Sequence, residues 1–384
     1  MTKPPLRVAY VTWSAARDRI LNALVDYSDS GRVEYSVIVL ARQPGPVYPD
    51  MSSRSVAVRS LGLRRVSLEQ VPFAAARLRR ILRGRQLDVV HSVLFYPALA
   101  VELARATMPT PPPSLLARHH EMRLHLDGKH LHVRLDRWMA RHATRVVAVS
   151  EAVRRVLTQH EKVPRNHVDV ILNGLDWQTT VGVDSTGVDH WRRQFGEHRL
   201  LVAAGRLDSQ KDYPTLLRAV AHVVGSHPDV HLAIAGVGPR EAELKDLVAQ
   251  LGLARSVSFL GWIHDVYDLM AAADVFVQSS VDEACPQTII EAAGLGVPVV
   301  TTTVGGVPEI LGDAVGRIDA GDDEALAARL RSTLDEPGAH RSHAKAIAPT
   351  VRSKFDARDM AQAYAGTYER LGVTGSDGSS RGHW

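Results

Sequence analysis

The feature that most constrains the fold of this chain is a regular alternation of short apolar runs with longer amphipathic segments. We expect strands at 7–12, 35–40, 89–92, 114–118, 146–149, 169–172, 200–204, 231–235, 257–260, 275–278, 299–301 and near 316–318. Helices are expected between them, for example at 213–224 and 241–251. This alternation is typical of parallel sheets covered by helices on both faces. The sequence therefore predicts an α/β protein.

The length and the charge distribution predict two domains. A chain of 384 residues exceeds the usual size of one hydrophobic core. The first 180 residues carry 27 Lys and Arg against 15 Asp and Glu, whereas the whole chain has 46 against 42. We expect two doubly wound domains at 1–178 and 191–355, separated by a Gly-, Asp- and Thr-rich linker at 179–190. A C-terminal helix at 356–371 and a disordered Gly- and Ser-rich tail at 372–384 follow.

The basic first half has two interpretations. Its arginines gather on a helix expected to begin near Pro72: Arg77, Arg79, Arg80, Arg83 and Arg85. They form either a solvated helix face or a surface for anionic lipid headgroups or an anionic acceptor. Nucleic acid is not an expected partner, because aromatic residues make up only 5% of the chain and base stacking has little support.

Cysteine content and hydropathy bear on the compartment. The single cysteine, Cys285, excludes an intrachain disulfide and fits a reducing environment. No apolar run approaches the roughly 20 residues that cross a bilayer, and nothing resembles a secretory signal. We expect a cytoplasmic protein, with peripheral contact at the inner membrane face as an option.

A loop in the second half offers two cations for a phosphorylated ligand. Residues 205–214 follow the strand expected at 200–204, and ligands bind at the carboxyl ends of strands in open α/β sheets. The guanidinium of Arg206 and the ammonium of Lys211 could neutralise a diphosphate from two sides. Alternatively, both are surface cations paired with Asp208 and Asp212.

The segment 282–300 adds two carboxylates beside a helix start. It reads as a turn, a short helix and a strand, with Glu283 and Glu291 on either side of the expected helix start. Free N–H groups at a helix start favour a phosphate ester. Carboxylates for hydroxyls and amides for a diphosphate together indicate a sugar nucleotide. The alternatives are a turn residue for Glu283 and a solvated helical carboxylate for Glu291. Cys285 is interpreted as a small space-filling residue.

Two further loops are weaker signals. Gly236 lies in a stretch that half resembles a dinucleotide fingerprint but lacks its third glycine. Its turn either runs beneath a bound nucleotide or is purely structural. The loop at 261–265 could hold a base through main-chain groups around Ile263, and Trp262 is either part of that edge or a packing residue.

The order of these loops resembles a known family. It reads Gly205-Arg206-Leu207 with Lys211, Gly236, Gly261, Ser279-Ser280, Glu283, Glu291, Pro298 and Gly305-Gly306 with Glu309. This set resembles the retaining GT-B glycosyltransferases of family 4, also called group 1. In the first half, 147–153 and 170–176 match the family's closing strands. Arg118-His119-His120 matches its acceptor-side histidine loop, and 355–371 its final helix.

The resemblance implies a fold and roles for these residues. The fold would be GT-B, with two Rossmann-like domains facing across a cleft and a C-terminal helix crossing back to the first. Arg206 and Lys211 would hold the donor diphosphate. Amides around Thr288 and Ile289 would meet phosphate, Glu291 would accept bonds from ribose hydroxyls, and Glu283 from the transferred sugar. His119, or His120 one residue later, would orient that sugar in the cleft.

The implied activity is that of a retaining hexosyltransferase (EC 2.4). The donor would be a nucleotide-diphosphate sugar, UDP-linked ahead of GDP-linked, and the acceptor a hydroxyl of a glycan, a lipid-linked glycan or a small natural product. The alternatives are a GT-B sugar-nucleotide epimerase or other non-transfer enzyme, and a non-catalytic polyanion-binding protein. No cofactor or metal is expected, because the chain has no Asp-x-Asp triplet. A zinc site at His125, His130 and His132 lacks supporting Cys or carboxylate spacing.

One loop departs from the family pattern. Many members carry a glycine pair in the first strand-to-helix loop, where this chain has Trp13, Ser14, Ala15, Ala16 and Arg17. Either the side chains of Ser14 and Arg17 meet the phosphate, or the loop recognises the acceptor. The same departure is compatible with a loss of activity.

Overall fold

The apolar runs form parallel strands in two separate sheets. The computed structural model describes residues 4–14, 18–42, 56–65, 67–84, 86–119, 128–178, 183–264, 266–312 and 316–376. The chain divides into a first unit of Met1–Leu175 with Asp356–Trp384 and a second unit of Asp176–Phe355. Each unit has its own hydrophobic core. Arg17, Arg85, His120, His125 and residues 179–182 of the expected linker lie outside the described residues.

The first unit contains, among its described residues, a seven-stranded parallel sheet in the order β3-β2-β1-β4-β5-β6-β7. Its strands are β1 (Leu6–Thr12), β2 (Val33–Ala41), β3 (Ala57–Leu63), β4 (Val89–Val93), β5 (Ser114–Arg118), β6 (Arg145–Ala148) and β7 (Val168–Val170). Its helices are α1 (Arg19–Tyr27), α3 (Val71–Arg83), α4 (Phe95–Ala106), α6 (His130–His142), α7 (Glu151–Arg155) and α16 (Ala357–Ser376). Short helical turns at Leu68–Gln70 and Arg165–His167 and a π-helical segment at Val156–His160 complete it.

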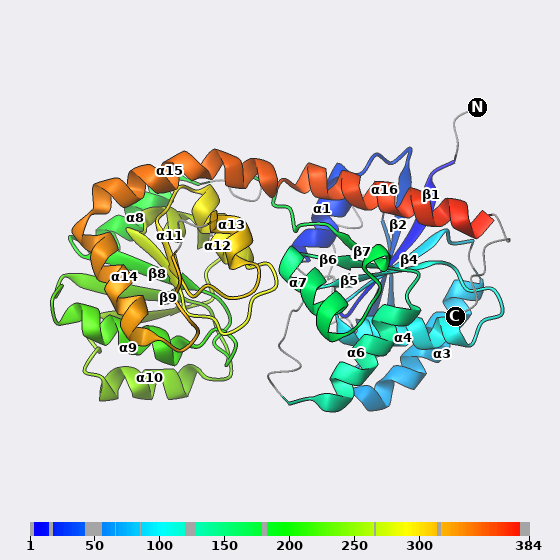
Figure 1. Ribbon diagram of the computed structural model, residues 1–384, viewed down its shortest axis with the longest axis horizontal. Coiled ribbons are helices and arrows are strands. Elements are labelled where there is room, and N and C mark those ends of the chain that lie inside the picture. Colours follow the sequence, from blue (N-terminus) through cyan, green and yellow to red (C-terminus); the bar gives the residue numbers. More distant parts are fainter. Residues whose placement is uncertain are drawn as a thin grey trace. The chain divides into compact units, whose positions relative to one another are not determined.

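The second unit contains a five-stranded parallel sheet in the order β10-β9-β8-β11-β12. Its strands are β8 (Arg199–Ala204), β9 (Val230–Ala235), β10 (Val257–Gly261), β11 (Val275–Gln278) and β12 (Val299–Thr301). Its helices are α8 (Ser185–Phe195), α9 (Tyr213–Val224), α10 (Glu241–Gln250), α11 (Val266–Ala272), α12 (Gln287–Gly294), α13 (Val307–Leu311), α14 (Asp323–Asp335) and α15 (Pro337–Lys354). These strands and helices are those of the described part of the chain. Helices lie on both faces of the sheet (Figure 1), with α9, α10 and α14 packed together on one of them.

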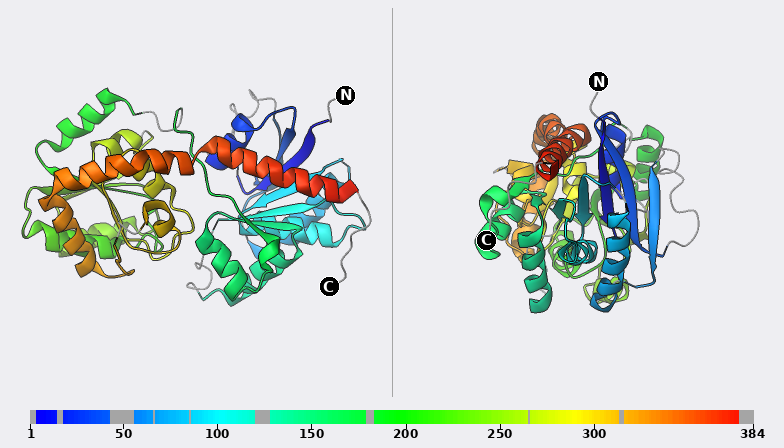
Figure 2. Two further views of the ribbon diagram at one scale, coloured as in Figure 1. Left: turned by 45° about the horizontal axis from the view of Figure 1, so that its top comes forward. Right: turned by 90° about the vertical axis from the view of Figure 1, so that its right-hand side faces the viewer.

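The last helix belongs to the core of the first unit. Met360, Tyr364, Tyr368 and Leu371 of α16 are buried in the same cluster as the residues of β1 and β2. Helix α16, red in Figure 2, lies beside α1. The C-terminal segment therefore completes the fold of the N-terminal unit.

The structure corrects several expectations. Strand β3 was not expected, because it is an edge strand whose Arg59, Ser60 and Gly62 are exposed and interrupt the apolar pattern. The strand expected near 316–318 is absent from the described residues. Three hydrogen bonds instead join Ile318 to Thr303, and Gly316 has a φ of 68° that breaks an extended run.

Helix α8 occupies part of the expected linker. Asp184 accepts a hydrogen bond from the Thr186 amide at 3.0 Å and caps the helix. A Cβ added to Gly187 would lie 2.0 Å from the Asp268 carboxylate of α11, so this glycine allows close helix packing rather than chain flexibility. At the other end, α16 continues to Ser376, so residues 372–376 of the expected disordered tail are helical.

Among the helices that the structure describes, none has both the length and the apolar character that crossing a bilayer requires.

Candidate functional site

Three loops meet where neighbouring strands of the second sheet end. The chain leaves β8 at Gly205 and β9 at Gly236, with φ values of 158° and 146°. A Cβ added to Gly236 would lie 1.9 Å from the carbonyl oxygen of Gly205, so only glycine fits. The Gly236 amide also donates to the carbonyl of Gly261, which ends β10, at 2.7 Å. This packing gives the Gly236 turn a structural reason, and its role beneath a nucleotide stays a prediction.

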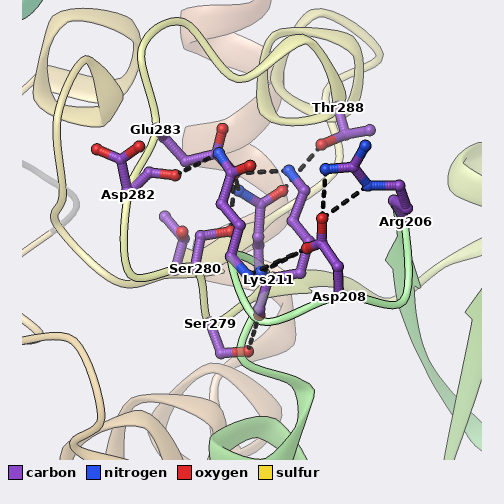
Figure 3. A network of polar contacts seen from close by, with 12 residues as sticks. Arg206, Asp208, Lys211, Ser279, Ser280, Asp282, Glu283 and Thr288 are labelled. Atoms are coloured by element: carbon purple, nitrogen blue, oxygen red, sulfur yellow. Dashed lines mark hydrogen bonds and ion pairs between the residues drawn. The ribbon is translucent and has the colours of Figure 1, made fainter. Parts of the chain in front are cut away.

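A carboxylate lies at the centre of the site. Oε1 of Glu283 accepts hydrogen bonds from Lys211 Nζ at 2.6 Å, Ser280 Oγ at 2.7 Å and Gln278 Nε2 at 2.8 Å. Figure 3 shows Lys211, Ser280 and Glu283 pointing toward one another. Glu283 is 5% exposed, and its main-chain carbonyl accepts from the Gly306 amide at 2.9 Å. The turn-residue alternative for Glu283 thus does not describe its side chain, which is buried within a polar network.

The two expected phosphate-binding cations have different partners. Nε of Arg206 donates to Asp208 Oδ2 at 2.6 Å, and Nη2 contacts the same oxygen. Asp208 Oδ1 also accepts from the Gln210 amide at 3.1 Å, so this carboxylate orders the loop and directs Arg206. The Arg206 side chain is 60% exposed, as the surface-cation alternative expects. Lys211 instead pairs with Glu283 and not with Asp212, so the fold brings its ammonium to the predicted sugar-binding carboxylate.

A buried tyrosine hydroxyl lies beneath the loop that follows β8. Tyr213 donates from its hydroxyl to the Gly205 carbonyl at 3.3 Å. Burial raises the pKa of Tyr213 well above its usual value, and the neighbouring charges of Asp208 and Glu283 raise it further. The hydroxyl therefore stays protonated and holds the turn that follows β8.

Helix α12 begins at the site. Its N-cap residue, Pro286, makes no side-chain cap, so the first N–H groups of the helix have no capping partner from that residue. Oγ1 of Thr288 donates to Gln278 Oε1 at 2.9 Å. The side chain of Ile289 is fully buried, so only its main chain can take part in binding.

Glu291 is buried on the same helix. It is 1% exposed, and its Oε1 accepts from the Tyr267 hydroxyl at 3.3 Å. Burial excludes the alternative of a solvated helical carboxylate. The expected role toward ribose hydroxyls stays a prediction.

The loop after β10 leaves an aromatic ring exposed. Trp262 is 60% exposed and Ile263 is half-buried. Exposure of most of the indole does not fit the packing alternative for Trp262. The main-chain role expected around Ile263 stays a prediction.

The remaining predicted residues belong to the first unit. His119 follows the last residue of β5 and is half-buried, and Ser14 is half-buried two residues after β1. Arg17 and His120 lie outside the described residues. The predicted site residues are thus distributed between the two units.

A buried ion triad lies next to His119. Arg118, at the end of β5, contacts Asp136 of α6 at 2.5 Å and Glu161 at 2.6 and 3.0 Å. All three side chains are at most 2% exposed. The two carboxylates raise the pKa of Arg118 against the opposing effect of its burial. Glu161 follows the π-helical segment, and Lys162 after it adopts a positive φ of 57°. The triad therefore fixes the end of the strand from which His119 extends.

Of the three histidines weighed for zinc, the structure describes His130 and His132. The ring of His132 packs against Phe95, with centroids 5.0 Å apart, and His130 begins α6. His125 lies outside the described residues. Within the part of the chain that the structure describes, no group of three or more His, Cys, Asp or Glu could hold a metal ion.

Sequence reasoning missed Gln278 and the orienting roles of Ser280 and Asp208. The available signal was a run of three polar residues, 278–280, directly after the apolar part of β11. Such residues at the carboxyl end of a parallel strand point to a ligand site.

Two family models match this chain. Residues 189–350 match the glycosyl transferases group 1, and residues 31–178 match glycosyltransferase family 4. The two matches fall in the second and first units respectively.

Several curated proteins are similar in sequence. The lipopolysaccharide core biosynthesis glycosyltransferase LpsD of Rhizobium meliloti is 30% identical over 44% of this chain and 49% of its own length. The phosphatidylinositol N-acetylglucosaminyltransferase GPI3 subunit of Saccharomyces cerevisiae is 30% identical over 44% of this chain and 37% of its own. The glycogen synthase of Mycobacterium tuberculosis is 28% identical over 61% of this chain and 56% of its own. The chain spans about half the length, or less, of the curated relatives it matches.

Solved structures share the fold along nearly the whole chain. Anabaena HepE in complex with UDP superposes with a TM-score of 0.79 at 21% identity, covering 95% of this chain and all of that one. The sucrose-phosphate synthase of Thermosynechococcus elongatus gives 0.81 at 17% identity, covering 96% of this chain and all of that one.

Proposed function

This chain belongs to the group 1 glycosyl transferases and has their two Rossmann-like domains of the GT-B fold, and from that premise we propose that it is a retaining hexosyltransferase. The proposed donor is a nucleotide-diphosphate sugar, UDP-linked ahead of GDP-linked. The proposed acceptor is a hydroxyl of a glycan, a lipid-linked glycan or a small natural product. Complexes of Anabaena HepE with UDP and with UDP-glucose support the choice of base.

One observation carries this proposal: the ammonium of Lys211 lies 2.6 Å from a carboxylate oxygen of Glu283, on loops that follow two adjacent strands. Arg206 lies on the same loop as Lys211. A cation beside a carboxylate at the carboxyl edge of the sheet suits a ligand that joins a diphosphate to a polyol. The start of α12 supplies uncapped amides for the same phosphates.

The chemistry that these residues would perform follows from charge. When a sugar leaves a diphosphate, negative charge grows on the leaving phosphate and positive charge on the sugar ring. Arg206 and Lys211 would stabilise the phosphate. Removing one such preorganised donor typically costs about 2.7–4 kcal/mol, or roughly 100- to 1000-fold in rate. Retention needs no protein nucleophile if the leaving phosphate deprotonates the acceptor on the same face, and the proposal includes neither a metal nor another cofactor.

The acceptor side is assigned to the first unit. His119, beside the buried triad, would orient the transferred sugar, and Ser14 and Arg17 would serve either the phosphate or the acceptor. A surface of the same unit suits an anionic partner: Arg77, Arg80 and Arg83 of α3 are exposed. Phe73 is 50% exposed, with the Arg77 guanidinium 4.2 Å from its ring centre. We propose peripheral contact with an anionic membrane face and a cytoplasmic location on this basis.

The proposal is tested by a panel of sugar nucleotides. A cognate donor at 100 times its dissociation constant should stabilise the protein by about 2.7 kcal/mol against thermal unfolding. The stabilising donor is then incubated with hydroxyl acceptors, and the anomeric configuration of the product is read by NMR. A changed sugar nucleotide formed without any acceptor would identify an epimerase. Stabilisation by none of the panel, with salt-sensitive binding to polyanions, would support the non-catalytic alternative.

A further inference from the structure

Gln278 is a buried amide at the carboxyl end of β11. It is 5% exposed, and a buried polar side chain needs hydrogen-bond partners. Its Nε2 donates to Glu283 at 2.8 Å, and its Oε1 accepts from Thr288 at 2.9 Å. A carboxylate can only accept, so the amide nitrogen must face Glu283 and the amide oxygen must face the hydroxyl. The orientation of Gln278 is therefore fixed from both ends.

The consequence for Glu283 is an asymmetric carboxylate. Lys211, Gln278 and Ser280 all donate to Oε1. No hydrogen bond from the described residues reaches Oε2. One oxygen is thus held by the protein, and the other is left to accept a bond from a ligand hydroxyl.

We infer that Gln278 is a positioning residue that directs Oε2 of Glu283 to a hydroxyl of the transferred sugar. Through Thr288 it also joins that carboxylate to the start of α12, where the diphosphate is expected. Gln278 would therefore determine how much more tightly the protein binds a sugar nucleotide than the bare nucleotide. The inference rests on the proposed function, because it assumes that the donor lies in this site.

The test measures that difference in the full chain. Gln278→Met keeps the length of the side chain and removes both hydrogen bonds. Dissociation constants are measured by calorimetry for UDP-glucose and UDP, and for GDP-mannose and GDP. We expect the sugar nucleotide to bind about tenfold more weakly, the typical effect of a lost hydrogen bond to a charged group. Binding of the bare nucleotide should change less than about twofold. Gln250→Met, at the exposed end of α10, is the control.

A second variant addresses the other end of the amide. Thr288→Val removes the hydroxyl that orients Gln278 and keeps the Thr288 main-chain amide at the start of α12. It should lower the preference for the sugar nucleotide in the same direction, and it keeps the test available if Gln278→Met does not fold. Because the two side chains act through one relay, the double variant should lose no more preference than the stronger single variant. Multiplied effects would contradict a relay.

The outcomes distinguish a wrong donor site from a wrong role for Gln278. If the wild-type protein binds neither nucleotide pair, the proposed donor site is wrong and the role of Gln278 fails with it. If the wild type prefers a sugar nucleotide and both variants keep that preference unchanged, the role of Gln278 alone is overturned.

Discussion

Lys211 has the most demanding position of any single residue in the proposed site, because its ammonium must serve both a carboxylate and a leaving phosphate. The residue is part-buried, and among the described residues its ammonium pairs with Glu283, at 2.6 Å. Lys211→Ala should lower kcat about 100- to 1000-fold. The free energy of unfolding should fall by only about 1–3 kcal/mol, since Gln278 and Ser280 still donate to Glu283.

The matched control for that prediction is Lys245→Ala. Lys245 lies on α10, is exposed and forms an ion pair with Glu241 at 2.7 Å. Its replacement should leave kcat unchanged. A Lys211→Ala enzyme that turns over like the Lys245→Ala enzyme would remove Lys211 from the chemistry.

Glu291 gives a prediction about affinity rather than rate. Glu291→Gln keeps the volume of the side chain and an oxygen that can accept from Tyr267, and it removes the charge. If ribose hydroxyls bond to this carboxylate, nucleotide affinity should fall roughly 10- to 100-fold. Tyr267→Phe keeps the carboxylate and should have the smaller effect. Titration calorimetry with the nucleotide compares the two, and wild-type affinity in Glu291→Gln would contradict the assignment.

At the residue scale, the sequence predicted the charged members of the site better than the neutral ones. Lys211 and Glu283 could be named because their charges imply a ligand and their positions follow predicted strands. Gln278 was missed because a neutral amide implies a ligand less directly than a charge does, although the polar run 278–280 after the apolar part of β11 marked the place. The pairing of Lys211 with Glu283 rather than Asp212 depends on which strands are adjacent, and sequence spacing does not contain that information.

At the scale of elements, predictability followed burial. Central strands such as β1 and β8 are largely apolar runs, because both faces of a parallel sheet are covered. The edge strand β3 has one open side and alternates with polar residues, so it escaped prediction. The first part of α8 was taken for a linker because the stretch 179–190 is rich in Gly, Asp and Thr, whereas the close approach of Gly187 to α11 is a tertiary property.

The triad of Arg118, Asp136 and Glu161 joins β5, α6 and the end of the π-helical segment. Arg118→Met leaves two buried carboxylates without their cation. Breaking a buried ion pair in this way should cost about 3–5 kcal/mol of unfolding free energy, measured by urea denaturation of the first unit. Arg317→Met removes an exposed pair with Asp319 and should leave the free energy of unfolding nearly unchanged. Equal costs in the two variants would contradict a structural role for the triad.

The contact between β4 and α16 predicts that the stability of the first unit depends on pH. Burial, and then the nearby charge of His119, lowers the pKa of His91 to about 3, and the ring bonds to the Tyr368 hydroxyl at 2.8 Å. The unfolded chain binds a proton at about pH 6.5, whereas the folded chain keeps His91 neutral. Stability is therefore full above that pH and falls as the pH drops toward 3, by about 1.4 kcal/mol per unit.

His91→Asn tests this linkage by removing the titrating group. Between about pH 6 and pH 4, the unfolding free energy of the first unit should change with pH by about 1.4 kcal/mol per unit less in His91→Asn than in the wild type. His343→Asn, exposed on α15, should retain the wild-type slope. An unchanged slope in His91→Asn would show that other groups cause the acid sensitivity.

At the scale of the whole molecule, the two cores do not follow the order of the chain, because the last helix belongs to the core of the first unit. The first unit needs the last described helix, because Met360, Tyr364 and Tyr368 lie in the same cluster as β1, β2 and α1. The second unit is continuous from Asp176 to Phe355 and has a core without any residue of α16. The predicted helix at 356–371 was placed by family resemblance, whereas its share of the first core follows only from the packing.

This division predicts different fates for the two units when the chain is shortened. A chain ending at Phe355 loses the buried face of α16, including three buried aromatic or thioether side chains whose individual removal typically costs about 2–5 kcal/mol. The first unit should then unfold, while the second keeps its sheet and, if the donor site is assigned correctly, its affinity for the nucleotide. Limited proteolysis would show a resistant fragment near 176–355, and calorimetry on the same sample would report nucleotide binding. A chain ending at Ser376 keeps every residue of the first core and should resist proteolysis throughout both cores. Resistance of both units in the shorter chain would contradict the role of α16, and loss of both would show that the second unit does not fold alone.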